Sequence, residues 1–124
     1  MKVEVSNGEL LDKLSILEVK KKKIKEESKL LYVEKELEHL NSLADSLDFS
    51  LEDSSYVKLK EINYQLWDIE DEIRKKEDEK DFGPRFIELS RSIYILNDER
   101  FRMKKEINMK TNSLFHEQKG HKNT

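Results

Sequence analysis

The sequence contains no cysteine, a single proline and only three glycines among its 124 residues. Without cysteine the chain can form neither disulfide bonds nor thiolate metal sites. Glycine and proline most often mark turns, and neither occurs between Gly8 and Gly83. The chain therefore has few positions at which it must turn, and long helices are expected.

Long hydrophobic runs and a dominant charge sign are also missing. No apolar run approaches the roughly 20 residues of a membrane-spanning helix, and the N-terminus lacks the apolar core of a signal peptide. Charged residues make up 41% of the chain, with both signs interleaved to a net charge of -3, so no positive field for nucleic acid is evident. We expect a cytoplasmic protein that binds neither membrane nor nucleic acid.

Apolar residues recur at helical spacing in three segments. Ser6 and Glu9 form a capping box, which predicts a helix beginning near Asn7. Because no breaker follows, this helix is predicted to run for roughly 35–40 residues, with a phase shift of its apolar stripe near Leu31 that could hide a kink. A loop at 46–54, rich in serine and aspartate, precedes the second helix. Gly83 and the following proline mark the turn into the third.

The fold predicted from these segments is all-α, an up-down-up antiparallel three-helix bundle or coiled coil with one long N-terminal helix. Two heptad stripes support it most strongly. They are Leu59, Ile62, Leu66, Ile69 and Ile73 in the second helix, and Phe86, Leu89, Ile93, Leu96, Met103 and Ile107 in the third. Residues 1–112 are expected to form one domain, and residues 113–124 a disordered tail.

The second helix continues into a dense run of charges after the only tryptophan. Three pairs of opposite sign are spaced four residues apart, which stabilises a helix by about 0.2–0.5 kcal/mol per pair. The pairs are Glu70 with Arg74, Asp71 with Lys75, and Glu72 with Lys76. This charge run is therefore interpreted as a solvated helix face.

Arg100 occupies a position in the third stripe where an apolar residue is expected, so it needs a partner. Pairing the second and third helices about the Gly83 turn places it beside Trp67 and Glu70, which predicts stacking on the indole and an ion pair with the carboxylate. One interpretation is a polar layer that fixes the register of the bundle. The other is a ligand site between the helices. The candidate binding residues are Asn63, Trp67, Glu70, Asp71, Arg74, Asn97 and Arg100.

The start of the first helix is its most apolar part. If a short loop joins the first two helices, Leu10, Leu14 and Leu17 extend beyond the bundle without a partner inside the chain. Exposed leucines of this kind usually mark an interface, which predicts a two-fold homodimer through them. The alternative is a kink or a register shift that covers them within one chain.

Several stretches together resemble a family of small uncharacterised helical proteins of bacteria and their phages. They are VSNGELLDKLSILEVK (5–20), EINYQLWDIEDEIR (61–74), DFG (81–83), FIELSRSIY (86–94) and NDER (97–100). The resemblance implies no activity, but it implies a setting among genes for surface-polysaccharide and glycosyl-transfer functions. The positions it suggests for a site are Glu9, Asp12, Lys13, Asn63, Trp67, Glu70, Asp71, Arg74, Asn97, Asp98 and Arg100.

The function favoured by the sequence is a non-catalytic helical binding or assembly module, accessory to such functions. No nucleophile lies beside a base in the predicted bundle, and no histidine or carboxylate cluster has metal-ligand spacing, so no catalytic residue, metal or cofactor is expected. The alternative is a small enzyme or ligand-binding bundle for an anionic ligand, a carboxylate or a sugar nucleotide, near Arg100.

Overall fold

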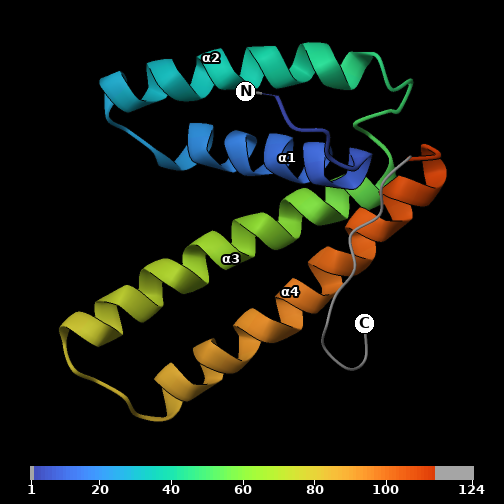
Figure 1. Ribbon diagram of the computed structural model, residues 1–124. Coiled ribbons are helices and arrows are strands. Elements are labelled where there is room, and N and C mark those ends of the chain that lie inside the picture. The colour runs from blue at the N-terminus through green and yellow to red at the C-terminus, as the bar shows by residue number, and fades with distance from the viewer. Residues whose placement is uncertain (1, 114–124) are drawn as a thin grey trace.

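The computed structural model describes residues 2–113 and contains four helices and no strand in this range. They are α1 (Asn7–Lys23), α2 (Glu27–Asp45), α3 (Ser54–Asp78) and α4 (Pro84–Lys110). The all-α prediction is confirmed, whereas the count of three helices is wrong. Figure 1 shows α2 lying antiparallel to α1, and α3 with α4 forming a second antiparallel hairpin on the opposite side of α1.

The long N-terminal helix predicted from the sequence is divided between α1 and α2. Ile24 and Glu26 have extended backbones, with ψ angles of 131° and 118°, and the chain reverses through them. No glycine or proline marks this reversal. Four lysines fill the last turn of α1, where positive charge is favourable against the helix dipole.

Burial of apolar side chains explains why the chain reverses here. Val33 and Leu37 of α2 belong to the same core cluster as Leu14 and Leu17 of α1. A continuous helix would leave both sets partly in water, at a cost of about 1.5–3 kcal/mol for each large side chain. The reversal breaks only a few backbone hydrogen bonds, which contribute about 1 kcal/mol each. Burial is therefore the larger effect.

The same reversal covers the N-terminal leucines. Leu14 and Leu17 are 0% and 2% exposed, and Leu10 is partly buried against the same cluster. The prediction that these three leucines extend unpartnered from the bundle is wrong, because α1 contacts α2, α3 and α4 within one chain. They give no support to an interface.

The other turns lie close to their predicted positions. The chain between α2 and α3 spans residues 46–53, near the predicted loop at 46–54, and Pro84 begins α4 after the N-cap Gly83. Ser6 Oγ accepts a hydrogen bond from the Glu9 N–H at 3.1 Å, as the capping box predicts. Ser113, assigned to the tail from the sequence, is buried, and residues 114–124 lie outside the described residues.

Asp53 caps α3, and its carboxylate is expected to make stability depend on pH. A hydrogen bond from the Ser55 hydroxyl, with further ones from Lys110 and the Ser55 N–H, lowers the pKa of Asp53 to about 2. Because the folded pKa lies below the unfolded value, this contribution is present above about pH 4 and lost as the pH falls towards about 2. Asp53→Ala should cost about 1 kcal/mol near neutral pH and progressively less in acid, measured by urea unfolding. An equal cost at every pH would contradict this.

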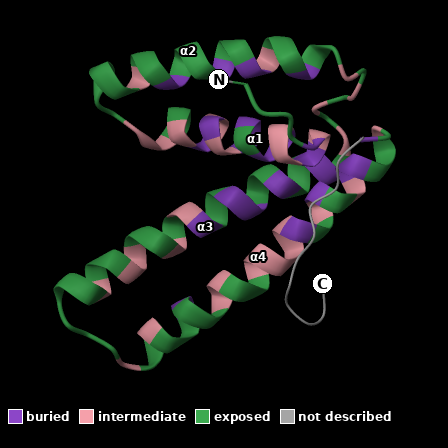
Figure 2. Ribbon diagram, in the orientation of Figure 1, coloured by how far each residue is buried: buried purple, intermediate pink, exposed green. Residues whose placement is uncertain are grey.

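Burial is uneven along the α3–α4 hairpin (Figure 2). Where α1 crosses it, Leu59, Ile62 and Leu66 are buried. Residues 67–98 form what we call the arm, in which Leu89 alone is buried. The arm contacts α1 near Asp68, which lies 2.5 Å from Lys23, and farther along its two helices extend away from α1 (Figure 1). Its exposed large apolar side chains are Phe82, Ile87, Tyr94 and Ile95.

Candidate functional site

Four polar side chains join α1, α3 and α4 near the centre of the molecule, and we call Asp12, Ser15, Asn63 and Arg100 the polar cluster. Arg100 Nε and Nη2 donate to the two carboxylate oxygens of Asp12 at 2.8 and 2.5 Å. The Asn63 side-chain amide donates to Asp12 Oδ1 at 2.9 Å and to Ser15 Oγ at 2.7 Å. The Ser15 hydroxyl donates to the Asp12 carbonyl at 2.7 Å. One carboxylate thus binds a side chain from each of two other helices.

The polar cluster is a closed network. The side chain of Asp12 is 2% exposed, and a carboxylate taken out of water needs several hydrogen bonds and an opposite charge to remain ionised. The planar guanidinium of Arg100 supplies two parallel bonds, the strongest geometry for such a pair. No buried side-chain nitrogen or oxygen in the described range lacks a hydrogen-bond partner. The cluster therefore fixes α1 against α3 and α4.

A second set of contacts fixes the start of α1 on the end of α4. The Gly8 N–H donates to Asn108 Oδ1 at 2.6 Å, and Lys104 Nζ lies 2.9 Å from Glu9 Oε2. Both Asn108 and Lys104 are buried. Asn108 thus satisfies one of the N–H groups that a helix N-terminus leaves without an intrahelical partner, and Glu9, whose side chain is 44% exposed, supplies the opposite charge for the buried ammonium of Lys104.

The predicted partners of Arg100 are wrong. Its carboxylate partner is Asp12 of α1, whereas Glu70 makes no ion pair and Trp67 no cation–π contact with any residue that the structure describes. The prediction considered only the α3–α4 hairpin, and the carboxylate comes from the helix that crosses it.

A small cavity lies beside the polar cluster and collects most of the predicted binding residues. Its volume is about 190 Å³. It is lined by Ile16, Val19, Asn63, Leu66, Trp67, Glu70, Asn97 and Arg100. Asn97 accepts a long hydrogen bond, 3.5 Å, from Arg100 Nη1. Asp71 and Arg74, also predicted to bind, do not line this cavity and are exposed.

The three charge pairs predicted along α3 do not form. Glu72 instead accepts two hydrogen bonds from Arg85 of α4, at 2.7 and 2.8 Å, and Lys76 lies 3.3 Å from Asp81 in the turn. The bidentate contact of Arg85 is geometrically better than a flexible lysine contact along one helix. Glu72 and Lys76 are therefore engaged across the hairpin.

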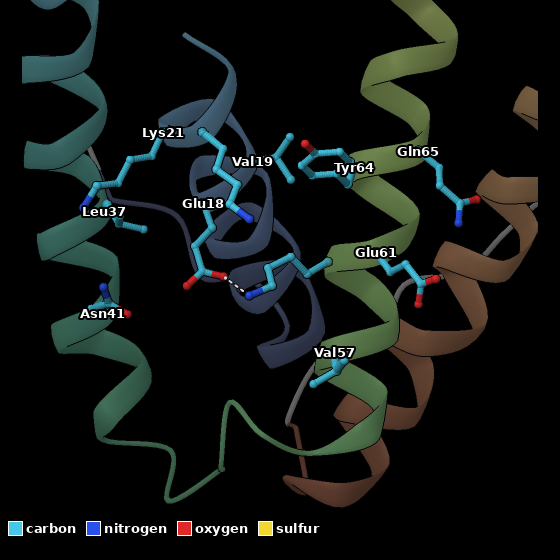
Figure 3. Close-up of a pocket in the computed structure, with 11 residues that line it drawn as sticks. Glu18, Val19, Lys21, Leu37, Asn41, Val57, Glu61, Tyr64 and Gln65 are labelled. Carbon is cyan, nitrogen blue, oxygen red and sulfur yellow. Dashed lines mark ion pairs between the residues drawn. The ribbon is translucent and has the colours of Figure 1, made fainter. Parts of the chain in front are cut away.

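A larger groove lies between α2 and α3, with α1 as its floor, and we call it the α2–α3 groove (Figure 3). Its volume is about 870 Å³. It is lined by Glu18, Val19, Lys21, Lys22, Leu37, Asn41, Val57, Lys60, Glu61, Tyr64 and Gln65. Val19 and Leu37 are buried apolar residues of the floor and one wall, and Val57 on the opposite wall is 47% exposed.

One charge in the groove is held by two neighbours. Glu18 Oε2 accepts the Tyr56 hydroxyl at 2.7 Å and lies 3.4 Å from Lys60 Nζ, the ion pair drawn in Figure 3. Burial, and then the hydrogen bond to Glu18, raises the pKa of Tyr56. The tyrosine therefore remains a neutral donor, and this end of the groove has little net charge.

The other end of the groove is basic. Lys23 is engaged with Asp68 and lies over the Tyr64 ring, 4.3 Å from its centroid, and the hydrogen bond to Asp68 raises the pKa of Lys23. Lys21 and Lys22 are exposed and form no ion pair within the described part of the chain. Lys22 Nζ also lies over the Tyr64 ring, 6.0 Å from its centroid. Both ammonium groups can still pair with an acidic partner.

Comparison with known proteins places the chain among others without an assigned activity. The whole chain, residues 1–124, matches a family of unknown function, DUF6165. The chain belongs to this family. No curated protein and no solved structure matches it. The expected resemblance to an uncharacterised family is confirmed at this level, and membership of DUF6165 supplies no reaction, ligand or partner.

In this DUF6165 protein, the pattern of residue types along the sequence does not mark two members of the polar cluster. Asp12 was marked only by the family resemblance, and Ser15 not at all. The available signal was their position, because both lie within the most apolar stretch of α1 and are nevertheless buried. A buried carboxylate three residues from a buried serine predicts hydrogen-bond partners on neighbouring helices.

The chemistry of the described residues is limited. No group of His, Asp or Glu suited to hold a metal ion occurs in residues 2–113, and no helix in that range is long and apolar enough to cross a membrane. The Ser15 hydroxyl is 0% exposed and donates to a backbone carbonyl, so it is not an activated nucleophile.

Proposed function

We propose that this DUF6165 protein is a non-catalytic binding module that takes an amphipathic helix of a partner protein into the α2–α3 groove. Helix-in-groove recognition buries the apolar face of one helix between others. The groove offers two helical walls and a floor, with the apolar side chains of Val19, Leu37 and Val57 set among charged and polar ones. A partner helix there would complete a four-helix arrangement with α1, α2 and α3.

The packing of α2 is the observation that supports this proposal. Among the helices, α2 contacts α1 alone, although helices of a compact bundle usually pack against two neighbours. Its side towards α3 therefore faces the groove and not another helix.

Charge and apolar surface indicate the partner's chemistry. Val19, Leu37 and Val57 would contact leucine-like side chains spaced three or four residues apart. Lys21 and Lys22, at the basic end, would meet aspartate or glutamate near one end of the partner helix. We therefore expect a helix with an apolar face and an acidic terminus.

The alternative, an anionic ligand at Arg100, is less well supported. Asp12 already occupies two donors of the guanidinium, and displacing it would leave a buried carboxylate unpaired at a cost of about 3–5 kcal/mol. The cavity beside Arg100, about 190 Å³, is also smaller than the roughly 300–1,000 Å³ of usual ligand sites.

Affinity capture with matched variants tests the proposed function. Val57→Arg places a charge in the groove, whereas Leu31→Arg places the same charge on α2, where Leu31 is 68% exposed and does not line the groove. Proteins captured from an extract of the source organism by wild type and by Leu31→Arg, but not by Val57→Arg, are purified and titrated by calorimetry. We expect roughly 30-fold or greater weakening by Val57→Arg, the loss of one buried hot spot.

Two results would show that the proposed function is wrong: no protein retained selectively by wild type, or a purified partner that binds Val57→Arg as tightly as wild type. Circular dichroism confirms that both variants are folded. Under this proposal, proteins of surface-polysaccharide or glycosyl-transfer function are the first partners to test.

A further inference from the structure

The face of α4 that points away from α3 in the arm is unusually apolar. Ile87, Tyr94 and Ile95 are 56%, 56% and 46% exposed. Their spacing of seven and eight residues places them on one side of the helix. The stripe that faces α3 is a different set, in which Leu89 is buried. An exposed helix normally carries polar residues on its outer side, so α4 is apolar on two faces.

A hollow of about 470 Å³ lies on this outer side. It is lined by Pro84, Ile87, Glu88, Arg91, Ser92 and Ile95, which we call the α4 outer face. These six positions have an internal symmetry. If a second α4 is laid antiparallel across the hollow, each lining residue of one copy faces a lining residue of the other: Pro84 faces Ile95, Ile87 faces Ser92, and Glu88 faces Arg91.

We propose that two copies of this chain associate through the α4 outer face, with their α4 helices antiparallel about a two-fold axis. An interface of this symmetry uses the same patch on both copies and must be self-complementary. The pairing above meets this requirement, because apolar residues occupy the two ends of the face and opposite charges occupy its middle. Exposed apolar surface is covered in both copies at once.

Charge complementarity specifies the antiparallel orientation. Arg91 is exposed and makes no ion pair or hydrogen bond with any residue in the described range. Glu88, one turn earlier, contacts Arg85 at 2.7 Å through one carboxylate oxygen, and its side chain is 68% exposed. In the antiparallel dimer each Arg91 meets the Glu88 of the second copy, and the pair occurs twice. A parallel arrangement would instead place like charges together, which is unfavourable.

This surface is independent of the α2–α3 groove. None of the residues that line the groove lies on α4, so the dimer leaves the groove open and does not rest on the proposed function. The N-terminal leucines are buried within each chain. The α4 outer face therefore takes their place as the proposed surface for self-association. The face spans roughly three helical turns, so we expect a small interface and a dimer that forms reversibly with rising concentration.

Sedimentation equilibrium over a concentration series tests the dimer, with charge reversals to test its register. Wild type should show a reversible monomer–dimer equilibrium. Arg91→Glu and Glu88→Arg should each weaken dimerisation by roughly tenfold or more, because each creates like-charge contacts twice. The double variant Glu88→Arg with Arg91→Glu should restore it, because the pairs are re-formed with their signs exchanged.

Arg74→Glu is the matched control, since Arg74 is an exposed arginine of the same arm on α3, and it should dimerise like wild type. A wild-type chain that stays monomeric at every concentration overturns the proposal. So does a single reversal that dimerises like wild type, or a double variant that fails to recover while both single variants are impaired. Equal weakening by Arg74→Glu would also overturn it, by showing a general charge effect.

Discussion

Replacing Asp12 by alanine is expected to destabilise the fold by about 3–5 kcal/mol, the usual cost of removing one partner of a buried ion pair. The substitution leaves the Arg100 guanidinium and the Asn63 amide without the acceptor that both share. A small domain has a total stability of about 5–15 kcal/mol, so much of it would be lost. Thermal and urea unfolding should show a melting temperature lower by roughly 15 °C.

A second variant separates the ion pair from the space that Asp12 fills. Asp12→Ala combined with Arg100→Met removes both charges and should be less destabilising than Asp12→Ala alone, because no charge is then left unpaired. The double variant could instead lose as much free energy of unfolding as the two single variants combined. In that case Asp12 and Arg100 are not energetically coupled, and the polar cluster does not fix the helices in the way described.

Replacing Gly8 by alanine is expected to cost about 2–3 kcal/mol, although alanine usually favours a helix over glycine by about 1 kcal/mol. An added Cβ would lie 2.4 Å from the Lys104 carbonyl oxygen and 3.0 Å from Asn108 Oδ1. The first of these is a backbone atom of α4 and cannot rotate away. Overpacking costs about 1–3 kcal/mol, and the buried bond from the Gly8 N–H would also be strained. Urea unfolding measures the net loss.

Gly83→Ala is the matched control for this prediction. A Cβ at Gly83 meets only the Asp81 side chain, at 3.3 Å, and its φ of -75° is available to alanine. The change should cost less than about 1 kcal/mol, the usual difference at a helix N-cap. If Gly8→Ala is as mild as Gly83→Ala, the close approach of α1 to α4 is not a constraint on the fold.

The α3–α4 hairpin could be predicted from the sequence because its signals are local. Each apolar stripe keeps helical spacing, and Gly83 with Pro84 marks the turn between the helices. The division of α1 from α2 could not be predicted in the same way. It has no breaker residue, and it is decided by the burial of Val33 and Leu37 against leucines earlier in the chain, which is a tertiary effect.

The candidate site was predicted only in part for the same reason. Helix pairing brought Asn63, Trp67, Glu70, Asn97 and Arg100 around one cavity. The carboxylate that binds Arg100 comes from α1. The position of α1 along the α3–α4 hairpin depends on where that first helix ends. The α2–α3 groove exists only because α2 folds back along α1, so no pattern within a single predicted helix indicated it.

The most direct measurement is a ¹H–¹⁵N NMR titration of the labelled protein with a helical peptide selected from a library of amphipathic helices. The peptide is selected for binding to the intact wild-type chain. No variant with a blocked surface is used, so the selection favours no binding surface in advance. Saturable shifts centred on the amides of Leu37, Val57 and Tyr64 are predicted. Shifts centred on Trp67, Asn97 and Arg100 would contradict the groove as the binding surface and assign binding to the cavity beside the polar cluster.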